Sequence, residues 1–297
     1  MRKSLFYVLT VILVAFQLFP IVMTAIGSFM PETEVRTGPP ANPWFVHGPT
    51  LAYYNFILTS AFGGTIPDDP YIRWSLRGLT TTNVSYFLQI LANSAIVATS
   101  VALLNIILGS LAAYSFARLR YRGSVTFFTF ILVSRLLPPI AVALPYYILM
   151  QSFGLLNDLS SIIVVHTVIT LPFTIWYLVL YLRSIPVAIE ESALVDGASL
   201  LRTMRKISLP IASTGLLAAG LFAFVLSYNE FLFAQFLLGN IDIMTLPAFL
   251  GTLSTSMDLY WAMIYACVTL TTIPAIVALT VVWRFINISR LAGALKA

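Results

Sequence analysis

The uncharged stretch FLQILANSAIVATSVALLNIILGSLAAYSF, residues 87–116, decides the fold class of this chain. A transmembrane helix needs about 20 mostly apolar residues, so this stretch is long enough to cross a bilayer. The rest of the chain has the same character: 59% of its 297 residues are hydrophobic, 9% are charged, and its mean hydropathy is +0.93. A soluble protein carries roughly a quarter charged residues. The bilayer is therefore the solvent in which this chain folds.

Apolar stretches of this kind predict an all-α, polytopic membrane protein with six transmembrane helices. The expected helices cover residues 5–29, 87–116, 124–150, 160–182, 211–237 and 260–286. The third is drawn as one helix across Arg135, which interrupts its apolar run. The first follows Arg2 and Lys3, as a signal peptide would, but its apolar run exceeds the usual core of about 7–15 residues. Residues 25–28 also make a poor cleavage site, so we expect this helix to be retained.

The positions of the basic residues predict the orientation in the membrane. Cytoplasmic loops of membrane proteins are enriched in Lys and Arg. If the N-terminus lies inside, four inner segments hold most basic residues: Arg2, Lys3, Arg118, Arg120, Arg122, Arg183, Arg202, Arg205, Lys206, Arg284, Arg290 and Lys296. The outer segments then hold Arg36, Arg73 and Arg77. Both termini are therefore expected in the cytoplasm, and the net charge of +5 indicates orientation and not nucleic-acid binding.

Neither disulfide nor metal chemistry is expected from the sequence. Cys267 is the single cysteine, so a disulfide within the chain is excluded. His47 lies in an outer loop and His166 within a span, and neither has clustered ligands nearby in the sequence. We expect His166 to be a buried hydrogen-bonding residue between helices.

The inner loop at residues 183–210 has the pattern of two short helices. Ser184 can cap the first, and Glu190 and Glu191 lie in its first turns, where the helix dipole favours acidic side chains. Gly197 can end this helix in a left-handed conformation, and Ser199 can cap the second helix. Two interpretations fit equally: an amphipathic pair on the membrane surface, or a docking element for a cytoplasmic partner.

The outer loop at residues 30–86 is rich in Pro, Gly, Asn and Thr, which predicts short helices and turns. We do not expect a separate domain with its own core there. The loop fits either a packed cap or a surface that touches an external partner.

The inner loop also resembles a family motif. Glu191-Ser192-Ala193, then Gly197, then Ile207-Ser208-Leu209-Pro210 resembles the EAA loop of binding-protein-dependent ABC import permeases. That motif reads Glu-Ala-Ala, three residues, Gly, nine residues, and Ile-x-Leu-Pro. Residues 196–199 (Asp-Gly-Ala-Ser) resemble the form usual in carbohydrate permeases. Ser192 departs from the motif because it replaces the first Ala.

Further matches extend the resemblance from Asn93 onward. They are Asn93-Ser94, Leu144-Pro145-Tyr146, residues 154–157 (Gly-Leu-Leu-Asn), residues 228–231 (Tyr-Asn-Glu-Phe) and the tail at residues 290–296. Together they resemble the second, smaller permease of maltose-type sugar importers, which has a MetI-like architecture. These permeases usually have a second Pro shortly after the Leu-Pro of the motif. This chain has Ser213-Thr214-Gly215 there instead, which leaves the local geometry of the fifth helix open.

The resemblance implies a division of labour among separate subunits. Two permeases form the pathway for a sugar across a prokaryotic inner (plasma) membrane, two ATPase subunits bind the inner loops, and an extracytoplasmic binding protein delivers the substrate. This chain has no Gly-x-x-x-x-Gly-Lys-Ser/Thr phosphate loop. We therefore expect a non-catalytic subunit without a bound cofactor, while the partner ATPase uses ATP and Mg. The residues that the resemblance implies in ATPase coupling are Glu190, Glu191, Ser192, Ala193, Asp196, Gly197 and Ala198.

The expected organisation is a first helix at residues 1–29, an outer loop at 30–86, a five-helix core at 87–287 and a cytoplasmic tail at 288–297. The core contains the coupling loop at residues 183–210. The alternative function is an ion-coupled secondary transporter, which would show inverted repeats and paired intramembrane carboxylates. Within the expected spans the sequence places one carboxylate, Glu230. An intramembrane enzyme would need a clustered nucleophile, base or metal set, and none stands out.

Charged residues within the spans are candidates for the transport pathway. A charge at mid-bilayer costs about 2.5–3.5 kcal/mol on insertion scales, so it usually faces a bundle interior or water. Arg135 is expected near mid-depth and Glu230 near the outer edge. A direct ion pair between Arg135 and Glu230 would need a break in the third helix, at Pro138-Pro139 or Pro145. We do not predict this ion pair. The candidate pathway residues are Arg135, Tyr228, Asn229 and Glu230, and the alternative for them is a structural role.

Overall fold

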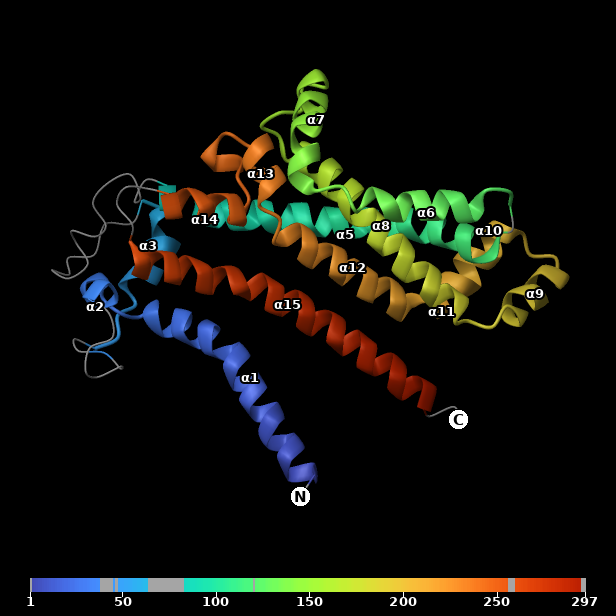
Figure 1. Cartoon of the computed structure of the whole chain (residues 1–297), viewed down its shortest axis with the longest axis horizontal. Helices are drawn as coiled ribbons and strands as arrows, with labels where there is room; N and C mark the ends of the chain where they lie inside the picture. Colours follow the sequence, from blue (N-terminus) through green and yellow to red (C-terminus); the bar gives the residue numbers. More distant parts are fainter. Residues whose placement is uncertain are drawn as a thin grey trace. The chain divides into compact units, whose positions relative to one another are not determined.

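Helices form the architecture of the chain, as predicted (Figure 1). A computed structural model describes residues 2–37, 45, 48–63, 83–119, 121–255 and 260–294, and no strand occurs in these ranges. The helices are α1 (Arg2–Gly27), α2 (Glu32–Thr37), α3 (Ala52–Ser60), α5 (Phe87–Arg118), α6 (Ser124–Ser134), α7 (Pro139–Ser152), α8 (Leu159–Arg183), α9 (Ala188–Val195), α10 (Leu200–Thr203), the π-helical turn η1 (Met204–Ser208), α11 (Leu209–Ile211), α12 (Ser213–Tyr228), α13 (Leu232–Leu237), the 3-10 turn η2 (Ile241–Ile243), α14 (Leu246–Thr255) and α15 (Trp261–Ala294).

The six expected spans occur as four continuous helices and two bent pairs. By length and composition, α1, α5, α8 and α15 can each cross a membrane. The first bent pair is α6 with α7, at 97°, and the second is residues 200–211 with α12, at 77°. If each bent pair is one span, the described chain has the six spans that the sequence predicts.

The expected continuous helix at residues 124–150 is wrong, because the chain breaks between α6 and α7. Arg135 follows α6 with φ −74° and ψ −17°, whereas Pro138 is extended, with φ −59° and ψ 129°. Pro139 disfavours the α conformation at the residue before it, and a proline has no N–H for a helical hydrogen bond. The Pro138-Pro139 pair therefore starts a new helix instead of continuing the old one.

The expected continuous helix at residues 211–237 is also wrong at both of its ends. The chain bends at Ala212, directly after η1 and Pro210, where a π-helical turn and a proline interrupt regular α-helical bonding. At the other end α12 stops at Tyr228, and the short helix α13 begins at Leu232. The fifth span is therefore bent, not straight, directly before Ser213-Thr214-Gly215, the stretch whose local geometry the sequence left open.

The chain divides into two compact units, each described by itself. The first contains residues 1–91 and 249–273, and the second contains residues 92–248 and 274–297. In the first unit, α2 and α3 are short helices within the expected outer loop. Glu32, which starts α2, is buried, and its carboxylate accepts hydrogen bonds from the backbone N–H groups of Trp261 (3.1 Å) and Ala262 (2.8 Å). Several expected features lie outside the described residues: His47, the rest of the outer loop at 64–82, Arg120, and the end of the tail at 295–297.

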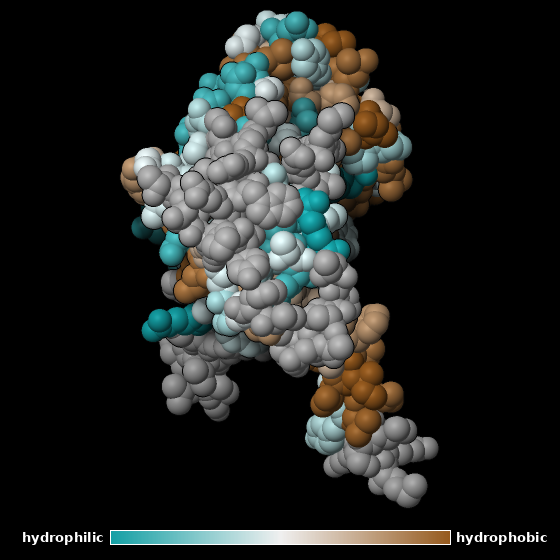
Figure 2. Space-filling view, turned by 90° about the vertical axis from the view of Figure 1, so that its left-hand side faces the viewer, coloured by the Kyte–Doolittle hydropathy of each residue, from teal (hydrophilic) through white to brown (hydrophobic). Residues whose placement is uncertain are grey.

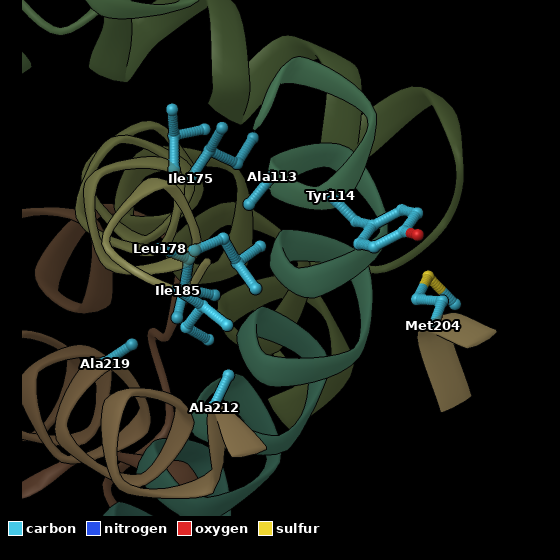
Figure 3. Packing of buried hydrophobic residues seen from close by; sticks show 10 residues of the cluster. Ala113, Tyr114, Ile175, Leu178, Ile185, Met204, Ala212 and Ala219 are labelled. Atoms are coloured by element: carbon cyan, nitrogen blue, oxygen red, sulfur yellow. The ribbon is translucent and has the colours of Figure 1, made fainter. Parts of the chain in front are cut away.

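The second unit is built on a close pack of α5, α8 and α12. A buried cluster joins side chains from these helices and from the inner loop (Figure 3), namely Ala113, Tyr114, Ile175, Leu178, Val179, Leu182, Ile185, Met204, Ala212 and Ala219. Small residues allow the helices to approach closely, as is usual in membranes. A Cβ on Gly109 would lie 2.7 Å from Thr174 Cγ2, and a Cβ on Gly220 would lie 2.5 Å from Ile106 Cδ1.

Large apolar side chains also lie at the surface, where a soluble protein would place polar ones. The apolar window of α1 is not buried at all, and Phe127 and Phe130 of α6 are 60% and 72% exposed. Figure 2 shows hydrophobic residues, drawn in brown, at the molecular surface. A helix whose own backbone satisfies its hydrogen bonds can face hydrocarbon on all sides. This surface therefore fits a bilayer environment.

Candidate functional site

The inner loop folds as two short helices separated by a glycine turn. Gly197 follows α9 with φ +85°, and its N–H donates to the carbonyl of Leu194 (3.1 Å). The Ser199 hydroxyl accepts a hydrogen bond from Arg202 N (3.4 Å) and caps α10, as predicted. The prediction for Ser184 is wrong. Ser184 follows α8 in a helical conformation, and its hydroxyl donates to the carbonyl of Tyr181 (2.7 Å) instead of capping α9.

The seven predicted coupling residues divide into an outward and an inward set. Glu191, Ser192, Asp196 and Gly197 are exposed, and Ala198 is half-buried. We call these four exposed residues the outward face of the loop. Glu190 and Ala193 are buried, at 4% and 8% exposure. Two neighbouring glutamates of one helix therefore have opposite environments, and only Glu191 is available to a partner.

Glu190 is held by α5, one helix that the sequence did not associate with it. Its Oε1 accepts a hydrogen bond from Arg118 Nε (2.9 Å), and its Oε2 accepts one from Tyr114 Oη (3.1 Å). Arg118 Nη2 also donates to the carbonyl of Ile185 (3.0 Å), in the linker between α8 and α9. The sequence feature that could have indicated this contact is Arg118 itself, because it is a charged residue at the cytoplasmic end of a long uncharged stretch.

A second polar cluster joins α8 to α12 at the far end of these helices. His166 is fully buried, its Nδ1 lies 2.9 Å from Ser227 Oγ, and its Nε2 lies 3.0 Å from Glu230 Oε2. His166 is therefore the buried hydrogen-bonding residue between helices that the sequence predicts. Glu230 also accepts hydrogen bonds from the backbone N–H groups of Leu232 (2.8 Å) and Phe233 (3.1 Å), and so it caps α13.

Arg135 lies at the break between α6 and α7, on the wall of an open pocket of about 580 Å³. The other lining residues are Ser134, Leu137, Pro139, Val142, Tyr146, Val168, Ile169, Pro172 and Phe233. The rings of Tyr146 and Phe233 meet edge to face, with centroids 5.6 Å apart. Although the third span is broken, the partner of Glu230 is His166 and not Arg135.

The remaining pathway candidates do not line this pocket. Tyr228 is buried and stacks on Phe224, with ring centroids 5.6 Å apart. Asn229 is exposed, and its Nδ2 donates to the carbonyl of Val225 in its own helix (2.8 Å). The structure thus brings Arg135 and Tyr146 to one pocket, while Tyr228, Asn229 and Glu230 contact neighbouring helical residues. Within the described ranges, no three His, Cys, Asp or Glu residues gather to hold a metal ion.

Comparisons with known proteins match most of this chain. Residues 105–288 match the family model "Binding-protein-dependent transport system inner membrane component". A putative ABC transporter permease protein of Streptomyces antibioticus is 31% identical over 69% of this chain and 89% of its own length. A sulfoquinovosyl glycerol transport system permease of Agrobacterium fabrum is 28% identical over 99% of this chain and 94% of its own length. A trehalose/maltose transport system permease of Thermococcus litoralis is 24% identical over 100% of this chain and 98% of its own length.

The fold has a counterpart among solved structures. A chain from the crystal structure of a bacterial ABC transporter involved in the import of the acidic polysaccharide alginate superposes with a TM-score of 0.72. The match covers 96% of each chain at 21% sequence identity, so it shows a shared fold.

Proposed function

Because this chain belongs to the family of binding-protein-dependent transport system inner membrane components, we propose that it is one of two permeases in an ATP-driven sugar importer. It forms half of the translocation pathway together with a second permease. A separate ATPase supplies the energy, and an extracytoplasmic binding protein delivers the substrate. The chain itself performs no covalent chemistry.

The observation that carries this proposal is the outward face of the inner loop. Glu191 and Ser192 are exposed on α9, and Asp196 and Gly197 follow directly on the same exposed turn. Small residues and a left-handed glycine allow another protein to approach closely, and the carboxylate can accept hydrogen bonds from it. The ATPase docks here.

The substrate class is a sugar or a sugar derivative. Relatives that match nearly the whole chain are named for trehalose and maltose and for sulfoquinovosyl glycerol. The pocket beside Arg135 combines a guanidinium group with the ring of Tyr146. An Arg fork can bind hydroxyls and anionic groups, and an aromatic ring offers a flat apolar surface to a sugar ring. The pathway therefore passes Arg135.

The orientation follows from the basic residues. Arg118, Arg183 and Arg202 lie beside or within the inner loop and are expected on the cytoplasmic side, together with both termini. The protein is a multi-pass protein of the inner membrane, with the outward face of the loop turned to the cytoplasm.

Two glycines allow a matched test of the docking role. Gly197 and Gly154 both have positive φ, +85° and +68°, and a Cβ on either would meet nothing within 4 Å. A leucine at either position costs on the order of 1 kcal/mol of backbone strain. Gly197→Leu should release the ATPase or uncouple its hydrolysis from uptake, because the leucine changes the outward face. Gly154→Leu, in the loop between α7 and α8, should retain the ATPase.

The measurement is copurification of the ATPase with the chain from detergent-solubilised membranes. Equal retention and normal coupling of the ATPase in both variants would show that the loop is only a pair of surface helices.

A further inference from the structure

The contact between α9 and α5 is separate from the outward face of the loop. Both carboxylate oxygens of Glu190 are bound by α5, one by Arg118 Nε (2.9 Å) and the other by Tyr114 Oη (3.1 Å). Arg118 and Tyr114 are four residues apart, so they lie on one face of α5 in successive turns. The first turn of α9 is therefore bonded to two successive turns of α5. We call these three residues the α5–α9 contact.

Arg118 extends this contact to a third segment. Its Nη2 donates to the carbonyl of Ile185 (3.0 Å), which follows α8 in the linker to α9. A guanidinium group holds two partners at a fixed angle because its donors form a rigid planar fork. The ends of α5 and α8 and the start of α9 are thus joined through one side chain.

The α5–α9 contact is buried, and this makes it resistant to separation. The side chains of Arg118 and Glu190 are 7% and 5% exposed. Pulling α9 away from α5 would break this ion pair and the hydrogen bond of Tyr114 together, which is unfavourable. The contact is therefore able to transfer a movement of α9 to α5.

A packed route continues from α5 to the pocket wall. The glycine at position 109 of α5 lets Thr174 of α8 approach closely. In turn, α8 supplies Val168, Ile169 and Pro172 to the pocket beside Arg135. Of the helices that the α5–α9 contact joins, α8 is thus the one that reaches the candidate pathway.

We propose that the α5–α9 contact transmits nucleotide-driven movement of α9 into α5 and α8, and that Glu190 is a positioning residue outside the ATPase-docking face. This inference rests on the proposed function, because the movement originates in the partner ATPase. It divides the coupling loop into an outward face that binds the ATPase and an inward contact that passes its movement on.

The test follows pocket accessibility in the complete transporter, reconstituted in lipid nanodiscs with its cognate subunits. The parent chain carries Cys267→Ala, which removes the native thiol, and Ser134→Cys, which places a thiol on the pocket wall. The rate at which a membrane-impermeant maleimide labels this thiol is measured with and without Mg and a non-hydrolysable ATP analogue. The parent should show a clear change in the rate when the nucleotide is added.

The decisive variant is Arg118→Met with Glu190→Leu, which replaces the charged contact by apolar side chains. Replacing both partners of a buried ion pair by apolar groups is often neutral for stability, so this complex should assemble and retain its ATPase. Its labelling rate should no longer respond to the nucleotide. Glu190→Gln should weaken the response, while Arg122→Gln, which changes an exposed charge just beyond α5, should leave it as in the parent.

The outcomes separate this inference from the function on which it rests. A nucleotide response in the double variant equal to that of the parent would overturn the transmission role while leaving the proposed function intact. A parent complex that retains no ATPase would contradict the proposed function and this inference together. Loss of the ATPase from the double variant would place Glu190 in docking and would also overturn the inference.

Discussion

Glu190 and Glu230 are two largely buried carboxylates of the second unit, and they bond the last residue of α5 and the first half of α8, respectively. Glu190 joins segments that are far apart in the sequence, because its cationic partner is Arg118 of α5. Glu230 also bonds a residue that is distant in the sequence, His166 of α8, but most of its hydrogen bonds come from the first N–H groups of α13. The first carboxylate connects elements, and the second stabilises a break within a span.

The difference lies in how each negative charge is balanced. Glu190 depends on a full positive charge, so removal of either partner leaves an uncompensated charge in a buried place. Glu230 lies at a helix N-terminus, where several backbone N–H dipoles together stabilise its negative charge. Loss of Glu230 leaves only uncharged N–H groups and an imidazole without their acceptor. The two ends of the bundle should therefore respond differently to the same kind of substitution.

Removal of Arg118 should have the largest effect. Arg118→Met leaves Glu190 buried and unpaired, which should lower the free energy of unfolding by about 3–5 kcal/mol. Adding Glu190→Leu should restore most of this loss because no charge then remains unpaired. Thermal unfolding of the purified chain in detergent measures both effects, with Arg122→Met as the exposed control. A double variant as unstable as Arg118→Met would show that the loss comes from the hydrogen bonds to Tyr114 and to the Ile185 carbonyl and not from an unpaired charge.

Removal of Glu230 should have an intermediate effect. Glu230→Ala removes the cap of α13 and the partner of His166, which should cost about 1–3 kcal/mol in the free energy of unfolding. Asn229→Ala is the matched control, because Asn229 is exposed and bonds only its own helix, so its cost should stay within about 0.5 kcal/mol. The comparison fails if Glu230→Ala destabilises the chain as strongly as Arg118→Met in the same unfolding measurement.

Hydropathy predicted the class of fold, and it predicted six spans, which is the number present if each bent pair counts as one; it missed the breaks within these spans. An apolar run stays apolar through a bend, so the run alone could not separate α6 from α7. The Pro138-Pro139 pair did carry the signal for this break. The end of α12 was harder to predict, because Glu230 terminates the span by starting α13, and this depends on the position of its backbone partners.

Motif spacing found the inner loop and placed Glu191 in the motif, but it could not tell that Glu190 is buried while Glu191 is exposed. Adjacent residues on a helix point in directions about 100° apart, so one can be buried while the other is exposed. Which one is buried depends on the helix that packs beside α9. That helix supplies Arg118, which is far from Glu190 in the sequence. Sequence patterns of one short segment contain no information on such a partner.

The smallest effect is expected at a third carboxylate, Asp158, which caps α8 on the expected outer side. Ser160 bonds this carboxyl with its side chain and with its backbone N–H (2.7 Å to Oδ1), and these hydrogen bonds lower the pKa of Asp158 below the ordinary value. Unlike Glu230, Asp158 is exposed, so water screens its charge and already solvates it. Asn is about as good a cap as Asp, so Asp158→Asn should change stability very little at neutral pH.

The pH dependence of this small effect has a definite sign. A carboxyl whose pKa is lower in the folded chain adds stability above the unfolded pKa of about 3.9, and this stability is lost as the pH falls through the folded pKa. The stability difference between the parent and Asp158→Asn should therefore be constant from about pH 5 to 8 and should move in favour of the variant only below about pH 4. Thermal unfolding of both chains across this range measures it. A difference that changes between pH 5 and 8 would contradict the lowered pKa of Asp158 and would remove the contrast between this exposed cap and the largely buried cap at Glu230.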